Sequence, residues 1–409
     1  MNVATDVKGW CPGILQPMAS GDGLIVRVRP RGGAFSLDAA GALTDLAQRL
    51  GNGHIDLTRR ANLQLRGLTG DRLSELQAEL AKLGLLDPHS ETEAVRNVMV
   101  APLAGLDPAQ AFDVRPIAFA IDDALTSDKG LHALPGKFGL LVDGGGVISI
   151  ASERADICLA AAGDAIAFGL DTAKGTQWLG TLSPAQAAET AIAAAHAFLA
   201  VATRGRMRGL SEAAFAEVQA AVAPRLSPMT GLPAVGGRRL GLMGGAVGIA
   251  APFGRLEAGQ LRQLVKLAAD AGAADLRLSP WRALYFRVRE EAGVFALEEA
   301  RRAGLIVEED DPVLQVEACP GAPDCKSSSV DARGDARRLA TIAAVHDYQG
   351  SIHVSGCAKG CARSLPSDLV LAGKAGAYRL IRKATTRGPV ERMVGVAEFE
   401  TLFGGGQDG

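Results

Sequence analysis

The sequence has 409 residues and a formal net charge of −2, which indicates about two to four domains and excludes a global attraction to nucleic acid or anionic lipid. No apolar run of about eighteen residues is present, so no transmembrane helix is expected. The first residues lack the basic and apolar regions of a signal peptide. Six cysteines are too few for a secreted disulfide scaffold. We therefore expect a cytoplasmic protein that binds neither nucleic acid nor membrane.

The first ninety residues predict strands and helices in alternation. Apolar and basic side chains alternate just after a loop rich in Gly and Pro, as in a strand. A serine and an aspartate then precede a leucine stripe at helical spacing that ends at a glycine. The expected elements are an arm over 9–23, a strand over 24–29, a helix over 36–50, an extended region over 54–67 and a helix over 71–83.

Residues 94–237 have a different pattern of apolar residues, glycines and prolines. Short apolar runs separated by Gly and Pro predict strands, and two long Ala-rich runs with serines at their starts predict helices. A segment with three prolines and three glycines then predicts a linker. The expected elements are a strand over 94–103, a hairpin over 134–150, a strand over 157–161, helices over 184–202 and 211–222, and a linker over 223–237.

After the linker the early pattern returns, with extended regions over 240–250 and 275–289 on either side of a helix over 256–271. The two halves match in spacing, which indicates a long internal duplication and not a solenoid. The cysteine-rich end then occupies the place of residues 94–160. In the proposed alignment, Leu57, Thr58, Leu63, Leu65 and Arg66 fall on Leu278, Ser279, Leu284, Phe286 and Arg287.

Four of the six cysteines form two pairs. Five residues separate Cys319 from Cys325, and three separate Cys357 from Cys361. Each pair lies in a loop that can wrap around a bulky ligand, and four thiolates are what a cubane iron–sulfur cluster requires. Structural zinc also takes four cysteines, but the five-residue gap is wide for its usual spacing. Zinc and plain structural thiols remain the alternatives to a cluster.

Polar and apolar residues alternate over 60–66, which in a strand places the polar set on one face. A solvated face could also produce such a row. Arginine with two amides is, however, a hydrogen-bonding set suited to a planar ligand with carboxylates, which arginine binds at two points. The second half loses the amides, so one ligand between the halves is expected. The candidate binding residues are Arg60, Asn62, Gln64 and Arg66.

Other features carry less information by themselves. Arg96 and Lys137 are isolated basic residues of the kind usually found on surfaces. The glycines over 241–248 lack the spacing of a dinucleotide loop, so no nucleotide site is expected there. Cys11 is expected to be a free thiol and Cys158 a core residue. No two histidines have the spacing of paired metal ligands.

Three stretches resemble the sulfite/nitrite reductase family. They are the last cysteine pair followed by Asp368-Leu369, the segment 58–67 and Leu134-Pro-Gly-Lys-Phe138. The resemblance implies an α+β fold with a pseudo-two-fold duplicated architecture. Its implied modules are a ferredoxin-like half-module over 1–92, an α/β module without a cluster over 93–222, a linker and second ferredoxin-like half-module over 223–305, and a cluster-bearing α/β module over 306–409.

The resemblance also implies a [4Fe–4S] cluster and a bound tetrapyrrole. The implied cluster ligands are Cys319, Cys325, Cys357 and Cys361. Arg60, Gln64, Arg96 and Lys137 would hold tetrapyrrole carboxylates or the small ligand at the metal.

Two departures from the sirohaem enzymes stand out, namely Lys359 where they usually have Asn and Gly139 where they have a second lysine. Residues 11–30 and 356–362 instead look like the precorrin-3B synthase branch of the family. That branch implies an O2-dependent monooxygenase of cobalamin biosynthesis, which hydroxylates precorrin-3A at C20 and closes a γ-lactone. It further implies a mononuclear non-haem iron with unassigned ligands, no bound sirohaem, and an electron-donating, NADH-linked reductase.

Two alternatives stay open at this point. One is a sirohaem-dependent assimilatory sulfite or nitrite reductase, which would show a Soret band. The other is a non-catalytic redox or zinc-stabilised module that binds a tetrapyrrole, which iron and sulfide analysis would distinguish.

Overall fold

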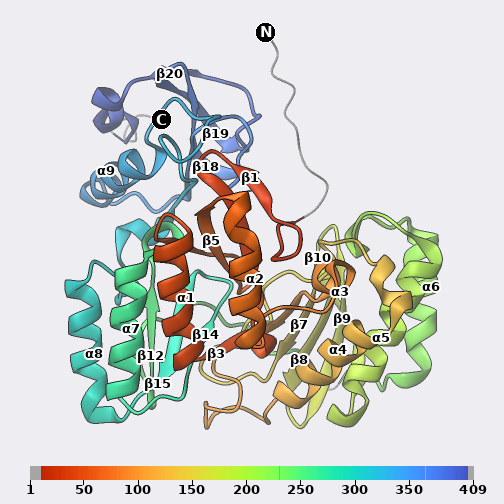
Figure 1. Cartoon of the computed structure of the whole chain (residues 1–409). Helices are drawn as coiled ribbons and strands as arrows, with labels where there is room; N and C mark the ends of the chain where they lie inside the picture. The colour runs from red at the N-terminus through yellow and green to blue at the C-terminus, as the bar shows by residue number, and fades with distance from the viewer. Residues whose placement is uncertain (1–10, 230, 364, 404–409) are drawn as a thin grey trace.

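The computed structural model describes residues 11–229, 231–363 and 365–403, and it contains four five-stranded sheets (Figure 1). Two sheets with helices α1, α2, α7 and α8 form the centre and left of the view. An α/β module drawn in yellow and green lies to the right, and a second one drawn in blue lies above. Within the described ranges, no helix has the length and apolar character needed to cross a membrane.

The two central sheets exchange strands. Sheet A has the order β1-β2-β5-β4-β13, and sheet B has the order β11-β12-β15-β14-β3. Strand β3 of the first half thus pairs with β14, and β13 of the second half pairs with β4, both antiparallel. The exchange joins the two halves by backbone hydrogen bonds. The strands are β1 (Met18–Ser20), β2 (Gly23–Val28), β3 (Ala34–Ser36), β4 (His54–Leu57), β5 (Leu63–Leu68), β11 (Gly241–Met243), β12 (Ala246–Ala250), β13 (Arg255–Glu257), β14 (Asp275–Leu278) and β15 (Ala283–Arg287).

The helices of the two halves share one hydrophobic core. The hydroxyl of Ser36 accepts the Ala39 N–H at 3.1 Å and so caps α1, which confirms the predicted helix start. Helices α1 and α7 pack against each other, and their leucines are buried in the same cluster. The helices are α1 (Leu37–Leu50), α2 (Leu73–Lys82), α7 (Ala258–Asp270) and α8 (Glu290–Arg302).

The proposed alignment of the halves agrees with the strand register. Leu57 lies opposite Leu63 in β4–β5, and the aligned Leu278 lies opposite Leu284 in β14–β15. Both hairpin turns also contain a non-glycine residue with positive φ, Ala61 at 51° and Arg282 at 60°. The two hairpins are therefore structurally equivalent.

The two α/β modules have the same topology. In each sheet the first three strands are parallel and the last two are antiparallel to their neighbours. The first module contains β6 (Val98–Val100), β7 (Leu140–Asp143), β8 (Ile157–Ala162), β9 (Ala165–Thr172), β10 (Gly175–Leu182), α3 (Ser90–Val95), α4 (Arg115–Ser127), α5 (Pro184–Val201) and α6 (Glu212–Val222). The second contains β16 (Val316–Ala318), β17 (Ile352–Ser355), β18 (Ser367–Lys374), β19 (Ala377–Ala384), β20 (Arg392–Val394) and α9 (Ala332–Val345).

Three local predictions differ from the structure. The expected strand over 94–103 is the end of α3 followed by the three-residue β6. The expected hairpin over 134–150 contains only β7, which pairs in parallel with β6 and β8 because it is a central strand of the sheet. The polar row does not lie on one strand, since Arg60 and Asn62 precede β5 and belong to the hairpin turn.

Candidate functional site

The two cysteine loops meet because they follow adjacent parallel strands. Cys319 follows β16 directly, and Cys357 comes two residues after β17. Parallel neighbours end at the same edge of a sheet, so the loops that leave them lie together. All four cysteines of the predicted set line one cavity of about 410 Å³.

Glycines allow the cysteine loops to pack closely. The Gly356 N–H donates to Cys319 Sγ at 3.0 Å. A Cβ on Gly356 would lie 2.3 Å from Ser328 Oγ, and one on Gly21 would lie 2.6 Å from the Cα of Cys325. The loop before β2 therefore presses against the backbone of the first cysteine loop.

The electrostatics of this cavity favour a cationic group among the thiols. Burial, together with the three other cysteines, raises the pKa of Cys361 to about 11. Burial also raises the pKa of Cys319. Such thiols become thiolates when a metal centre compensates their charge. In the described part of the chain, no three His, Cys, Asp or Glu side chains converge on one ion. Four thiols spread around a cavity fit a cube better than a single zinc.

Arginines from both halves of the chain also line this cavity. Arg27 on β2 lies opposite Gln64 on β5, and both line the cavity. Arg27 is 9% exposed, and its Nε and Nη1 atoms have no hydrogen-bond partner among the described residues. Arg282 also lines the cavity and donates to the Ala362 carbonyl at 3.3 Å. Sequence reasoning missed Arg27, although its alternation with Val26 and Val28 was the available signal.

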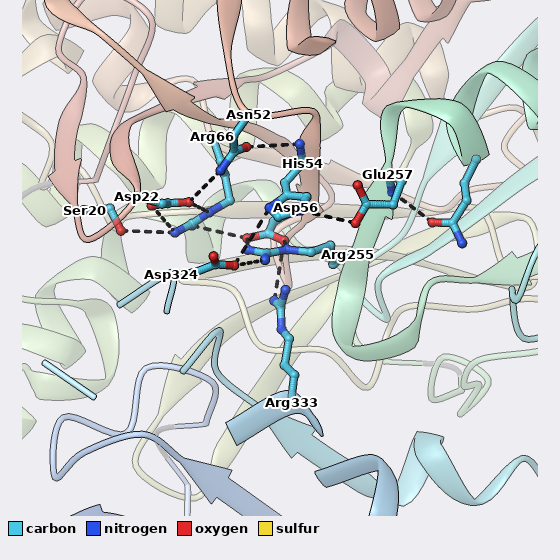
Figure 2. Close-up of polar contacts among 11 residues, drawn as sticks. Ser20, Asp22, Asn52, His54, Asp56, Arg66, Arg255, Glu257, Asp324 and Arg333 are labelled. Carbon is cyan, nitrogen blue, oxygen red and sulfur yellow. Dashed lines mark hydrogen bonds and ion pairs between the residues drawn. The ribbon is translucent and has the colours of Figure 1, made fainter. Parts of the chain in front are cut away.

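The buried carboxylate of Asp56 contacts three arginines (Figure 2). Asp56 on β4 accepts Arg255 Nε at 2.8 Å and lies 3.2 Å from Arg66 Nη1 and 3.5 Å from Arg333 Nη2. Although burial opposes ionisation, the three arginines hold the pKa of Asp56 well below its usual range. Arg255 also contacts Asp324, which precedes Cys325. The cluster module is thereby tied to sheet A, whose strands β4 and β13 come from different halves of the chain.

The predicted binding residues are divided among several places. Gln64 and Arg66 line the cysteine cavity, but Arg66 is engaged by Asp22 at 2.8 Å. Asn62 is buried in the hairpin turn, where its N–H donates to Thr58 Oγ1 at 3.2 Å. Arg60 lines a second cavity of about 470 Å³ and donates to the Lys137 carbonyl at 2.7 Å.

Arg96 and Lys137 do not line either cavity. Arg96 is buried, pairs with Asp87 at 2.8 Å and donates to the Arg29 carbonyl at 2.8 Å. Lys137 is exposed. The first residue therefore fastens α3 to β2, and the second meets the site through its backbone.

The two remaining cysteines differ from each other. Cys158 is fully buried, and burial raises its pKa to about 11, in agreement with the expected core role. Cys11 is half-buried, and although burial opposes it, Arg27, Arg60 and Arg29 lower its pKa. The arm is held there because Glu93 accepts the Leu15 N–H at 3.0 Å.

Comparison with known proteins identifies the family. The family model described as "Nitrite/Sulfite reductase ferredoxin-like half domain" matches residues 16–83 and 243–303. The family model described as "Nitrite and sulphite reductase 4Fe-4S domain" matches residues 91–175. A precorrin-3B synthase from a Sinorhizobium species is 32% identical across 94% of this chain and 85% of its own length. This chain belongs to the nitrite and sulfite reductase family. The resemblance found in the sequence is thus confirmed.

Other members of the family agree with the fold. The ferredoxin–nitrite reductase of Synechococcus elongatus is 26% identical across 89% of this chain and 78% of its own length. The structure of Mycobacterium tuberculosis NirA protein matches with a TM-score of 0.73 and 20% identity, over 92% of this chain and 79% of NirA. The expected α+β duplicated architecture is confirmed, and the family makes this chain an oxidoreductase.

The match to the 4Fe-4S domain model lies in the first α/β module, whose one cysteine in the sequence is Cys158. The second module repeats the same strand order and carries the two cysteine pairs. The family fold thus occurs twice in this chain, and the second copy alone has a set of thiols suited to an iron–sulfur cluster.

Proposed function

We propose that this chain is a monooxygenase of cobalamin biosynthesis that converts precorrin-3A to precorrin-3B. The similarity to the Sinorhizobium precorrin-3B synthase along nearly the whole chain carries this proposal. The reaction places one oxygen atom of O2 at C20 and closes a γ-lactone with the ring A acetate. The second oxygen atom leaves as water, and two electrons come from an NADH-linked reductase.

The four cysteines would hold a [4Fe–4S] cluster, with Cys319, Cys325, Cys357 and Cys361 as its ligands. When bound, such a cluster supplies electrons one at a time. The close glycine contacts and the Gly356 N–H bond to Cys319 Sγ support this assignment, because they prearrange the loops around the cavity.

The arginines would bind the carboxylates of the substrate and orient C20. Arg27 supports this role most directly, since it is buried, lines the cysteine cavity, and has Nε and Nη1 atoms without partners among the described residues. A buried guanidinium of this kind is stabilised by a carboxylate that accepts two of its hydrogen bonds. Gln64 beside it offers an amide, and Arg60 lies where the substrate would enter the second cavity.

The remaining residues of the proposed binding set would position the binding arginines and the segments that carry them. Arg66 and Arg96 are held by the partly buried carboxylates of Asp22 and Asp87, and Asn62 stabilises the turn that carries Arg60. Lys137 accepts the Arg60 hydrogen bond through its carbonyl. Within the described ranges, no side-chain group suited to a mononuclear iron is assembled, so we assign it no ligands and no step.

A sirohaem-dependent nitrite reductase is the second candidate, because several similar relatives are named ferredoxin–nitrite reductase. Lys359 and Gly139 favour the monooxygenase over it. The deciding experiment measures O2 uptake and product mass with precorrin-3A and an NADH-linked reductase, using protein purified without oxygen. We expect a product heavier by one oxygen atom and a protein spectrum without a Soret band. Extractable sirohaem with nitrite reduction would overturn it, and a cluster or zinc protein without turnover would indicate a non-catalytic module.

A further inference from the structure

The second cavity lies between the first hairpin turn and the α/β module that lacks the cysteine pairs. Arg59 and Arg60 line it from the turn, and Arg154, Arg206 and Arg208 line it from the module. Its volume of about 470 Å³ is in the range of small-molecule sites. Arg59 also lines the cysteine cavity, so the two cavities adjoin.

Buried aspartates anchor two of these arginines by one edge. Arg206 Nε donates to both oxygens of Asp156, at 2.8 and 2.7 Å, and Asp156 is fully buried. Arg154 donates to Asp171 through Nε and Nη2, at 3.0 and 2.6 Å. The Nη atoms of Arg206 have no protein partner among the described residues. An anchored guanidinium with a free edge is preorganised to bind an anion.

Two other arginines of this cavity, Arg208 and Arg60, are less neutralised, whereas Arg59 pairs with Glu317. Arg208 lies 3.9 Å from Asp171 and makes no hydrogen bond within the described ranges. Arg60 has a backbone carbonyl as its partner, and burial, with Arg206 and Arg27 nearby, lowers its pKa to about 10. Among the described residues, the lining includes a single carboxylate, Glu153, and its Oε1 accepts Trp281 Nε1 at 2.7 Å. The cavity thus has an excess of positive charge.

We infer that the second cavity binds carboxylate arms at one edge of the tetrapyrrole, while the ring reaches the cysteine cavity past Arg59. This inference rests on the proposed function and extends it to the module without the cysteine pairs. Arg206 and Arg208 then distinguish rings by the number of carboxylate arms they carry. A ring that has lost its acetate carboxylates loses the contacts of this cavity.

The test uses the full-length protein and fluorescence titration with two porphyrins. Uroporphyrin III carries acetate and propionate arms, whereas coproporphyrin III keeps the propionates and has methyl groups in place of the acetates. The variants are Arg208→Ala and Arg206→Lys, the second of which keeps a charge beside Asp156. Arg225→Ala is the control, because Arg225 is similarly exposed and pairs with Glu189 away from the cavity.

Each cavity variant is expected to bind uroporphyrin III roughly tenfold more weakly, since Arg208→Ala removes a charged donor and Arg206→Lys removes the free Nη edge of the guanidinium. Coproporphyrin III binding should change less, and Arg225→Ala should match the parent protein with both. Unchanged uroporphyrin binding in both cavity variants, with a parent protein that binds it, would overturn this inference alone. A parent protein that binds neither porphyrin would instead contradict the proposed tetrapyrrole site, and this inference with it.

Discussion

Arg255 and Asp56 form a two-point ion pair across the exchanged strands, with Nε to Oδ1 at 2.8 Å and Nη2 to Oδ2 at 3.2 Å. The residues lie opposite each other in β13 and β4, which come from different halves of the chain. Because Arg255 also contacts Asp324 and Asp56 also faces Arg333, this pair connects the exchange to the cysteine loops (Figure 2).

Asp56→Asn should destabilise the protein by about 3 to 5 kcal/mol at neutral pH, because it leaves buried arginines without their shared carboxylate. The measurement is urea unfolding. Asp45→Asn is the matched control, since Asp45 and its partner Arg262 are both exposed and such pairs contribute about 1 kcal/mol or less. Equal effects of the two changes would contradict the central role of Asp56.

The same residue predicts a pH dependence. The folded-state pKa of Asp56 lies below the value of about 3.9 of an unfolded aspartate. Its stabilisation is therefore complete above that value and is lost as the pH falls towards the folded-state pKa. Urea midpoints of the parent protein should fall below about pH 4 more steeply than those of Asp56→Asn. Parallel pH profiles would show that other groups cause the acid sensitivity.

Gly21→Ala should lower iron and sulfide content. A Cβ at this position would lie 2.5 to 2.7 Å from backbone atoms of residues 324–326, so the first cysteine loop must move. Gly41→Ala is the control, because its Cβ meets open space and alanine favours a helix. Iron analysis and the electron paramagnetic resonance spectrum of the reduced protein report the outcome. Spectra of Gly21→Ala like those of the parent protein would show that this backbone contact is not needed for cluster binding.

Cys361→Ser should abolish the cluster absorption, while Cys158→Ser should keep it. Cys361 belongs to the cavity set, whereas Cys158 is fully buried in a core cluster of the first α/β module. The second change should appear as lower stability. Visible absorption and thermal unfolding, measured on both proteins, distinguish the two roles. Loss of cluster absorption in Cys158→Ser at unchanged stability would contradict the assignment.

Arg27→Ala and Arg96→Ala should affect different properties, tetrapyrrole binding in the first case and stability in the second. Arg27 has polar atoms without partners in the described structure, so its loss should weaken tetrapyrrole binding roughly tenfold with little effect on stability. Arg96 is buried and pairs with the partly buried Asp87, so its loss should cost about 3 to 5 kcal/mol of stability. Porphyrin titration and urea unfolding test both. The reverse pattern would make Arg96 the substrate-binding residue.

Sequence alone identified the duplication and the cysteine pairs, because both depend on spacing along one chain. Leu57 and Leu278 aligned in the sequence, and they occupy equivalent places in their hairpins. Helix α1 was predicted from Ser36 and its leucines, since capping and amphipathic spacing are local.

Misplaced elements had non-local causes. The polar alternation over 60–66 continued into a strand only from Leu63, because Ala61 takes positive φ to close the hairpin turn. The central strand β7 was mistaken for part of a hairpin, since its partners β6 and β8 lie on either side and pair in parallel. The strands that pair with β7 lie outside the segment that was predicted to be a hairpin.

The domain boundaries and the assignments of individual binding residues stay predictions. The sequence by itself determined the family, the repeated fold and the four thiols, since motif and period are properties of the chain. Only the tertiary structure decided that β3 and β13 change sheets, that Asp56 gathers Arg66, Arg255 and Arg333, and that Arg206 faces Arg60 across a cavity. These relationships join residues far apart in the sequence, and burial and charge pairing come into existence only when the chain folds.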